Sequence, residues 1–460
     1  MCGIIGYYGE SITSTKIING LKLISHRGKD NYGISDGKKT EFSKDLSLES
    51  QSNFFLAHAL HSIVDNVPQP IENAFAANCE IYNWKFLAEK HSISSKNDAE
   101  LLYQLLVKKG ISCLDEVDGD YAFAWKDNNK LILARDIIGI KPIIWYSEGK
   151  NIWFASENKS LENKGKLLDP RKILVFENGN VSFIDRPFFN LDTKTISKEK
   201  AVQETADLLK ESVAKRLQGI EKIGILFSGG VDSTTLAVIV KSMHKNVILY
   251  TAGFEESEDL LWAKKISGVL ELPLKVFVVK DLKEIEKEAK SVIKIIETSD
   301  VMKVGVALPF HLACRLAHDD GCKVILSGLG SEEIFAGYQR HKQAKDINAE
   351  CLNGLLSMYD RDLYRDDVIT MANNIELRVP FLDKNLVEFA LSIPGNMKIV
   401  NGLDKAILRD AAVLLGVPKE SAMRKKRAAQ YGSGVDKAIA KLTKIAKYKT
   451  KKEYLDSLGG

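Results

Sequence analysis

The stretch Ser228-Gly229-Gly230-Val231-Asp232-Ser233 decides the fold of the chain. An apolar run from Ile223 to Phe227 precedes it and predicts a short buried strand, while the run from Thr234 to Lys241 predicts a helix. A glycine turn between a strand and a helix start lets backbone N–H groups approach an anion without interference from Cβ atoms. The positive end of the helix dipole favours the same anion. The stretch therefore predicts a phosphate-binding loop.

The side chains of this loop add to the prediction. Ser228 and Ser233 supply hydroxyl donors, whereas Asp232 repels phosphate unless a cation lies between them, which makes it a candidate Mg²⁺ ligand. No Gly-Lys-Ser/Thr follows, so this is not the Walker pattern. The loop resembles the pyrophosphate loop of the ATP pyrophosphatases, which adenylate a substrate and release pyrophosphate. The alternative is a structural strand–turn–helix with spare glycines.

Alternation of strand and helix patterns continues beyond the loop. Apolar runs follow at Val247–Tyr250, Leu274–Val279 and Val324–Leu326, and helical patterns at Asp259–Leu270 and Pro309–Ala317 separate them. This alternation predicts a doubly wound parallel sheet, in which ligands bind at the carboxyl ends of the strands. The loop and two further segments fall at such ends and are expected to meet at one nucleotide: Gly253, and Ser327 with Gly328.

The segment from Ser327 to Glu333 places glycines beside acids. Glu332 or Glu333 is expected to complete the Mg²⁺ site with Asp232. A helix start capped by Ser331 is the structural interpretation, and the two are compatible. Lys405 is a candidate to neutralise the leaving pyrophosphate, although a single lysine is more often a solvated surface charge. The run from Arg424 to Arg427 adds further cations.

The N-terminus carries a second chemistry. Cys2 follows an initiator methionine that is readily removed before a small residue, and the freed α-amine can act as base for the thiol. The apolar run Ile4–Tyr8 predicts a central strand that fixes this nucleophile. Taken alone, an incidental buried cysteine is the simpler interpretation.

Motifs further along give Cys2 a context. They are His26-Arg27-Gly28, the run Asn78 to Asn83, the run Asn97 to Glu100, the run Asp118 to Ala124, Ala134-Arg135-Asp136, the run Gly139 to Pro142, and the run Phe154 to Glu157. Together they resemble the class II glutamine amidotransferase domain, over residues 2–186. The resemblance implies a layered αββα sandwich in which Cys2 attacks the glutamine amide. It also implies that the Asn78 side chain and the Cys79 backbone bind the oxyanion, and that Glu80 and Asp98 hold the glutamine ammonium group.

Two positions depart from that family's pattern. The family has glycine where this chain has Cys79, so the backbone donor depends on the conformation that Cys79 adopts. The family also has an arginine, which binds the glutamine carboxylate, where this chain has Leu60. His61 is a candidate substitute, and a hydrogen-bonded surface histidine is the alternative.

Residues 198–460 resemble the synthetase domain of asparagine synthetase, after a linker at 187–197. The resemblance implies that glutamine, aspartate and ATP are the substrates, that Mg²⁺ is bound, that an acyl-adenylate forms, and that ammonia passes between the domains to give asparagine. It assigns Asp232 and Glu332 to the metal. The nucleotide and pyrophosphate are assigned to Phe227, Ser228, Gly229, Gly230, Asp232, Ser233, Gly253, Ser327, Gly328 and Lys405.

Leu329 interrupts the Ser-Gly-Glu-Gly pattern of that family. Leucine cannot accept a proton from the attacking ammonia, and the same Leu-containing run occurs in a divergent branch of the family. Two alternatives therefore remain: the same ligase chemistry on another carboxylic acid, and a degenerate nucleotide-binding regulatory paralogue. The intact Cys2, Asn78 and phosphate loop weigh against the second.

Composition argues against several other functions. A net charge of +4 and the absence of zinc-binding cysteine pairs weigh against nucleic-acid binding and tRNA modification. No apolar run is long enough to cross a membrane, and no signal peptide is visible. Six scattered cysteines fit a reducing compartment, so a cytoplasmic protein is expected, and a homodimer is compatible with the sequence.

Overall fold

The computed structural model describes residues 2–63, 66–425 and 427–459. The chain divides into two compact units, one ending at Phe188 and the other beginning at Phe189. Residues 186–197, which include the predicted linker, form no helix or strand.

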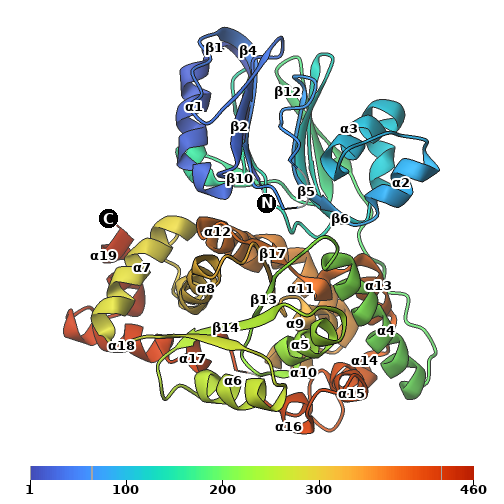
Figure 1. Ribbon diagram of the computed structural model, residues 1–460, viewed down its shortest axis with the longest axis vertical. Coiled ribbons are helices and arrows are strands. Elements are labelled where there is room, and N and C mark those ends of the chain that lie inside the picture. Colours follow the sequence, from blue (N-terminus) through green and yellow to red (C-terminus); the bar gives the residue numbers. More distant parts are fainter. Residues whose placement is uncertain (1, 64–65, 426, 460) are drawn as a thin grey trace. The chain divides into compact units, whose positions relative to one another are not determined.

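The first unit contains two antiparallel sheets with helices outside them, which confirms the predicted αββα sandwich (Figure 1). Helix α1 (Ser14–Leu23) lies beside one sheet, and α2 (Trp84–Lys90) and α3 (Asp98–Lys109) lie beside the other. Apolar side chains such as Ile4, Ala76 and Phe154 form the core between the sheets. The first sheet has the order β10-β8-β9-β1-β4-β2-β3 and the second β12-β11-β7-β6-β5.

The strands of the first sheet are β1 (Gly3–Thr13), β2 (Asn31–Ser35), β3 (Thr40–Ser43), β4 (Gln51–Leu60), β8 (Ile144–Glu148), β9 (Asn151–Ala155) and β10 (Lys166–Leu167). Those of the second are β5 (Phe75–Ile81), β6 (Gly119–Asp127), β7 (Lys130–Arg135), β11 (Lys172–Glu177) and β12 (Asn180–Asp185). Strand β1 is central in its sheet, as the run after Cys2 predicts, whereas β5 is an edge strand.

The second unit is built on a five-stranded, wholly parallel sheet of order β15-β14-β13-β16-β17, which confirms the predicted fold class. Its strands are β13 (Ile223–Leu226), β14 (Val247–Gly253), β15 (Leu274–Val278), β16 (Val324–Leu326) and β17 (Glu376–Arg378). The helices that bear on the site are α4 (Lys198–Arg216), α5 (Val231–Met243), α6 (Glu258–Val269), α9 (Ser331–Ile334), α15 (Ala406–Leu414) and α16 (Lys419–Ala422).

Helix α8 (Val301–Asp319) begins eight residues before the predicted start at Pro309. Proline is favourable in the first turn of a helix, which is why the pattern indicated a start there. The helix begins instead where the Asp300 carboxylate accepts a hydrogen bond from the Lys303 N–H at 2.8 Å. Pro309 therefore lies inside the helix.

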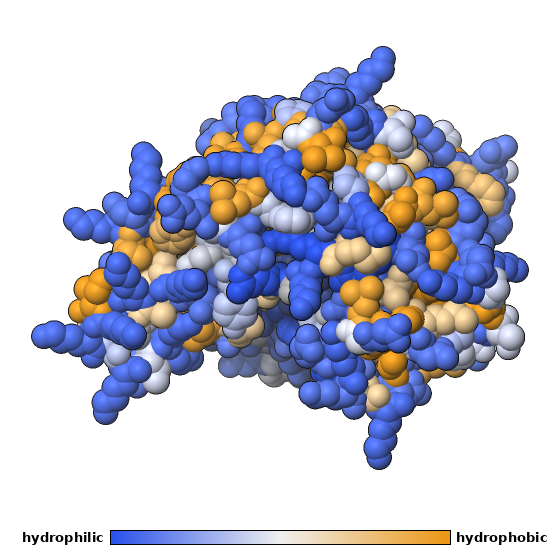
Figure 2. Space-filling model, turned by 90° about the horizontal axis from the view of Figure 1, so that it is seen from below, coloured by the Kyte–Doolittle hydropathy of each residue, from blue (hydrophilic) through white to orange (hydrophobic). Residues whose placement is uncertain are grey.

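On the face shown in Figure 2, hydrophilic residues cover most of the area and apolar residues lie in small groups between them. Within the described part of the chain, no helix combines the length and the apolar character that a membrane span needs.

Candidate active sites

Cys2 lies immediately before β1, and both of its peptide groups are fixed by side chains. Its backbone nitrogen donates to Oδ1 of Asn78 at 2.9 Å, and its carbonyl oxygen accepts from Nε of Arg27 at 3.0 Å. Arg27 is buried and also donates to Glu157 at 2.9 Å. The Cys2 residue is 8% exposed. Cys2 is thus held from two directions.

Only the oxygen of the Asn78 side-chain amide has a hydrogen-bond partner. Its Oδ1 accepts from Cys2, while Nδ2 is buried and has no hydrogen-bond partner. A buried N–H donor without an acceptor is costly, so such an atom indicates that an acceptor arrives with a ligand. The predicted oxyanion donor therefore has the environment that its role requires.

Cys79 lies on the free edge of β5, in ordinary extended backbone. The N–H groups two residues on either side, of Ala77 and Ile81, both bond to side chains beyond this edge, at 2.7 and 2.9 Å. Because N–H directions alternate along a strand, the Cys79 N–H points to the same edge. Glycine is thus not required here. Burial, and next the Asp98 carboxylate, raise the pKa of the Cys79 thiol well above its usual range.

Asp98 is the first residue of α3 and is oriented by its own backbone contacts. Its carboxylate accepts from the N–H of Ile81 and from the N–H of Ala99, both at 2.9 Å. The helix start is fixed by Asn97, whose side chain accepts from Glu100 N–H at 2.9 Å. This arrangement brings the predicted ammonium-binding acid beside the strand that carries Asn78.

Near the predicted carboxylate site, Leu60 is buried and His61 is only 6% exposed. The alternative interpretation of His61 as a surface histidine is therefore wrong, because the residue directly follows the buried end of β4. Its predicted contact with the glutamine carboxylate stays a prediction.

In the second unit, the predicted phosphate loop follows β13 and runs into the first turn of α5. Gly229 has φ +70°, and a Cβ there would come within 2.6 Å of the Trp262 ring, so both the conformation and the space require glycine. Gly328, on the β16 side, closely approaches Asp232, since a Cβ at Gly328 would lie 2.7 Å from the Asp232 Cβ. The ends of β13 and β16 thus converge as predicted.

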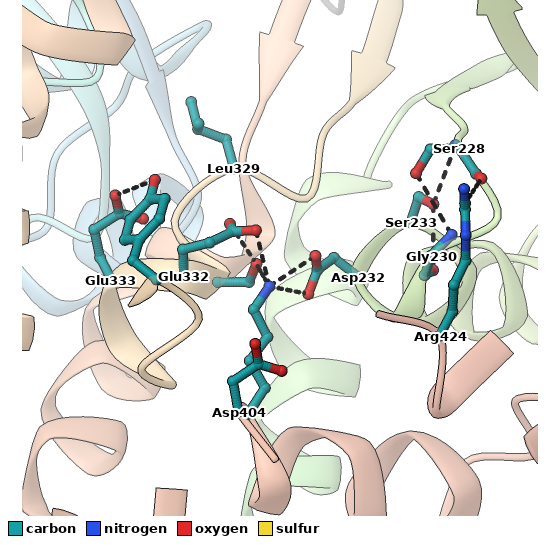
Figure 3. Close-up of polar contacts among 12 residues, drawn as sticks. Ser228, Gly230, Asp232, Ser233, Leu329, Glu332, Glu333, Asp404 and Arg424 are labelled. Atoms are coloured by element: carbon teal, nitrogen blue, oxygen red, sulfur yellow. Dashed lines mark hydrogen bonds and ion pairs between the residues drawn. The ribbon is translucent and has the colours of Figure 1, made fainter. Parts of the chain in front are cut away.

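Lys405 connects the acids of this site. Its Nζ donates to both oxygens of Asp232 at 2.8 Å, to the Ser331 hydroxyl at 2.9 Å and to Glu332 at 3.0 Å (Figure 3). The lysine side chain is 1% exposed, so the solvated-surface alternative for Lys405 is wrong. The structure thereby brings together three residues that sequence analysis placed in one site.

Glu333 bonds to a different set of residues from Glu332. Its Oε1 accepts from the Tyr338 hydroxyl at 2.9 Å and from Arg361 at 2.5 Å. Burial, followed by repulsion from Glu332, raises the pKa of Glu333 to about 7. Of the two candidate metal acids, only Glu332 shares a partner with Asp232. Among the described residues, no cluster of three or more acids, histidines or cysteines has the spacing of a complete metal site.

A pocket opens beside the loop. Ser228, Gly230, Asp232 and Lys405 line it, and so do Val231, Asp259 and four further cations: Arg409, Arg424, Lys425 and Arg427. The concentration of positive charge around backbone N–H groups suits a polyanion such as pyrophosphate.

The sequence-predicted helix cap at Ser331 is wrong. Gly330, with φ +95°, occupies the cap position of α9 and makes no side-chain bond, while the Ser331 hydroxyl bonds to Lys405 and Glu332. A Cβ at position 330 would lie 2.4 Å from Leu382, so glycine is required there.

The comparisons with known proteins follow the same division of the chain. A family model for a glutamine amidotransferase domain matches residues 1–176, and one for asparagine synthase matches residues 204–350 and 342–458. The chain is 35% identical to a putative glutamine-hydrolysing asparagine synthetase of Methanocaldococcus jannaschii, covering all of this chain and 98% of the relative. The chain belongs to the family of glutamine-hydrolysing asparagine synthetases. The predicted family is confirmed, and so is the expectation of an amide ligase.

A further member of the family is similar over most of its length. Asparagine synthetase B of Escherichia coli is 29% identical, over 95% of this chain and 82% of that protein. Among solved structures, a glutamine phosphoribosylpyrophosphate amidotransferase from B. subtilis has a TM-score of 0.35 at 16% identity, covering 60% of this chain and 65% of that chain.

Not every predicted residue of the synthetase site lines the pocket. Phe227 is a core side chain, 3% exposed, whose N–H bonds to the Tyr250 carbonyl at 2.8 Å. The remaining predicted residues that do not line the pocket are Gly229, Ser233, Gly253, Ser327, Gly328 and Glu332.

Sequence reasoning missed two residues that contact the loop. Trp262 donates to the Gly229 carbonyl at 2.8 Å, and Ser421 donates to the same carbonyl at 2.6 Å. Neither has a signal in the sequence, because both contacts arise from packing of distant segments. The cations at Arg424 and Lys425 were visible as a basic run, but their place in the pocket was not.

Proposed function

We propose that the chain makes asparagine from aspartate, ATP and glutamine, with Cys2 hydrolysing glutamine and the loop from Ser228 to Ser233 binding the pyrophosphate of ATP. The observation that carries this proposal is the convergence of Asp232, Glu332 and Lys405 beside the loop, in a chain whose other unit presents an N-terminal cysteine. The predicted domains are residues 2–186 and 198–460.

At the first site, the Cys2 thiol attacks the glutamine amide carbon. After removal of the initiator methionine, the α-amine of Cys2 accepts the thiol proton, and Asn78 Oδ1 orients that amine. Nδ2 of Asn78 and the Cys79 N–H stabilise the oxyanion, and Glu80 and Asp98 hold the substrate ammonium group. Ammonia leaves with the transferred proton, and water then hydrolyses the thioester to glutamate.

At the second site, the aspartate β-carboxylate attacks the α-phosphorus of ATP and pyrophosphate leaves. The loop N–H groups and the cations lining the pocket stabilise the charge on the leaving group. Ammonia then attacks the acyl-adenylate and displaces AMP. Asp232 and Glu332 would hold Mg²⁺, since two carboxylates with phosphate oxygens form a donor set that this ion prefers. When bound, Mg²⁺ neutralises phosphate charge.

The remaining expectations extend this proposal. The protein acts in the cytoplasm, binds no nucleic acid and assembles as a homodimer. A ligase for another carboxylic acid is the second candidate function, and Leu329 is the observation that favours it.

The test is a product assay with ATP, Mg²⁺ and either glutamine or ammonia, against aspartate and a panel of other acids. Asparagine, AMP and pyrophosphate are expected in equal amounts. Cys2→Ala is expected to abolish the glutamine-dependent reaction and to preserve the ammonia-dependent one. The proposal fails if folded, ATP-binding protein releases no pyrophosphate with aspartate at saturating ammonia.

A further inference from the structure

The carbonyl groups of the pyrophosphate loop are held by side chains from outside the loop. The Gly229 carbonyl accepts two hydrogen bonds, from the Trp262 indole N–H at 2.8 Å and from the Ser421 hydroxyl at 2.6 Å. The Ser228 carbonyl accepts from Nη1 of Arg424 at 2.6 Å (Figure 3). Trp262 belongs to α6 and Ser421 to α16, so two separate elements fix the Gly229 carbonyl, while Arg424, which follows α16, fixes the preceding carbonyl.

Fixing a carbonyl also fixes the next N–H group. A peptide group is planar and its C=O and N–H point in opposite directions. The bonds to the Ser228 and Gly229 carbonyls therefore set the directions of the N–H groups of Gly229 and Gly230. Gly229 is the residue with a positive φ, where the backbone has the most freedom to turn the other way. The three outside donors thus select one orientation of the loop.

Arg424 is itself immobilised. Its Nη2 donates to Asp259 at 2.7 Å, its guanidinium lies 5.2 Å from the centre of the Trp262 ring, and its side chain is 9% exposed. An arginine bonded through two nitrogens and stacked on an aromatic ring holds a defined position. It can therefore act as a fixed support for the loop.

Arg427 provides a natural comparison on the same segment. It lines the same pocket, but its side chain is 54% exposed and bonds to Glu258 rather than to the loop. The two arginines contribute equal charge to the pocket and differ in their contact with the loop backbone.

We propose that Arg424, together with Trp262 and Ser421, is a positioning residue of the pyrophosphate loop, holding its carbonyls outward so that its N–H groups are preorganised for the pyrophosphate of ATP. This inference rests on the proposed function of the loop as a pyrophosphate site. It predicts that pyrophosphate binding by the loop depends on the Arg424 hydrogen bond as well as on the positive charge of Arg424.

The experiment compares Arg424→Gln, Arg424→Lys, Trp262→Phe and Arg427→Gln in the full chain. Two quantities are measured: Mg²⁺-pyrophosphate binding by calorimetry, and aspartate-dependent ATP–pyrophosphate exchange over a range of salt concentrations. Arg424→Gln is expected to lower exchange about 100-fold, the usual loss when an oriented donor set is misplaced. Trp262→Phe keeps an aromatic ring but loses the indole N–H. It is expected to lower exchange about tenfold, as the loss of one hydrogen bond does.

The comparison variants separate orientation from charge. The exchange rate of Arg424→Lys is expected to lie between those of wild type and Arg424→Gln. Lysine keeps the charge, but it lacks the planar guanidinium that bonds to Ser228 and Asp259 at once. Arg427→Gln is expected to lower exchange about threefold. This loss disappears at high salt, because salt screens an exposed charge.

The proposal is overturned if Arg424→Gln and Arg427→Gln lose pyrophosphate affinity equally and with the same salt dependence. A purely structural role is shown if ligand-free melting falls in Arg424→Gln while Trp262→Phe binds pyrophosphate as wild type does; that result also overturns it. Pyrophosphate binding is measured without any acceptor acid, so this inference can fail while aspartate amidation succeeds. Failure of wild-type exchange with aspartate, with pyrophosphate binding intact, counts instead against the proposed function.

Discussion

Asn78 orients the backbone nitrogen of Cys2 at 2.9 Å through its side-chain oxygen, and its amide nitrogen is left buried and without a partner. One side chain thus holds the backbone of Cys2 through its oxygen and leaves its N–H donor available to a ligand. Asn78 belongs to β5, and Cys2, 76 positions away, directly precedes β1 of the other sheet. Their pairing depends on the sandwich fold, which brings β1 and β5 together.

The first prediction follows from this relationship. Asn78→Asp keeps an oxygen for the Cys2 nitrogen and replaces the free N–H donor by a second acceptor. Glutamine hydrolysis is expected to fall by about 10²–10³-fold, the typical loss for one oxyanion donor. Ammonia-dependent asparagine synthesis in the same variant serves as the control and is expected to stay at the wild-type level. Glutaminase activity within threefold of wild type would contradict the oxyanion role.

The second prediction concerns the acids around Lys405. Asp232→Asn removes one of the two carboxylates that share the lysine ammonium group and that are proposed to hold Mg²⁺. ATP–pyrophosphate exchange is expected to fall by about two or more orders of magnitude, since metal bridging contributes several kcal/mol. Glu333→Gln is the matched control. It changes a neighbouring buried acid that bonds to Tyr338 and Arg361 instead, and its loss is expected to stay below about tenfold. Equal losses in both variants would make Asp232 a structural residue.

The third prediction concerns Lys398, the last residue of α14 (Gly395–Lys398). Its ammonium nitrogen is buried without a hydrogen-bond partner, and burial lowers the pKa of Lys398 to about 8. Because the folded state binds the proton less tightly than the unfolded state, the wild type gains stability as pH rises from about 8 to 10.5. Lys398→Met, of similar length, is expected to stabilise the protein by about 3 kcal/mol at pH 7.

Urea unfolding at several pH values checks this prediction. The advantage of Lys398→Met is expected to shrink above pH 8 and to vanish above pH 10.5. Arg427→Met, at a half-exposed cation of the same unit, is the control and is expected to change stability by less than about 0.5 kcal/mol. Destabilisation by Lys398→Met at pH 7 would show that the ammonium group has a stabilising partner.

Local pattern predicted the elements that carry the chemistry. The strand–turn–helix at Ser228 was predicted because glycine, acid and hydroxyl residues occur together between an apolar run and a helical one, and β13 and α5 flank it. Helix α4 begins at Lys198, directly after the predicted linker, where the Ser197 side chain accepts from the Lys200 N–H. These features depend on neighbours in the sequence.

The features that were missed depend on distant contacts. Ser421 bonds to a carbonyl 192 residues away, and Arg424 bonds to one 196 residues away. Ser331 reads locally as a helix cap, but Lys405 takes its hydroxyl and Gly330 takes the cap position. Sequence pattern alone cannot predict which group such a side chain bonds to, because tertiary packing determines the partner.

Leu329 is the subject of the last prediction. It lies between β16 and α9, its N–H donates to the Ser327 hydroxyl at 3.3 Å, and its half-buried side chain points away from the acids around Lys405 (Figure 3). Ammonia must lose a proton after it attacks an acyl-adenylate, and a positioned base contributes about 10²–10⁴-fold to such a step. Leu329→Glu is therefore expected to raise the rate of amide formation from aspartate at saturating ammonia.

Leu329→Gln is the matched control, because glutamine has the shape of glutamate and cannot accept the proton; it is expected to give no gain. Steady-state rates of all three proteins are measured on aspartate and on the best alternative acid. If the natural acceptor is a more apolar acid, Leu329→Glu instead lowers turnover, because it buries an unpaired carboxylate against the substrate. A fall with aspartate in Leu329→Glu, together with faster wild-type turnover of another acid, would replace aspartate as the acceptor and leave the two-site chemistry of the chain in place.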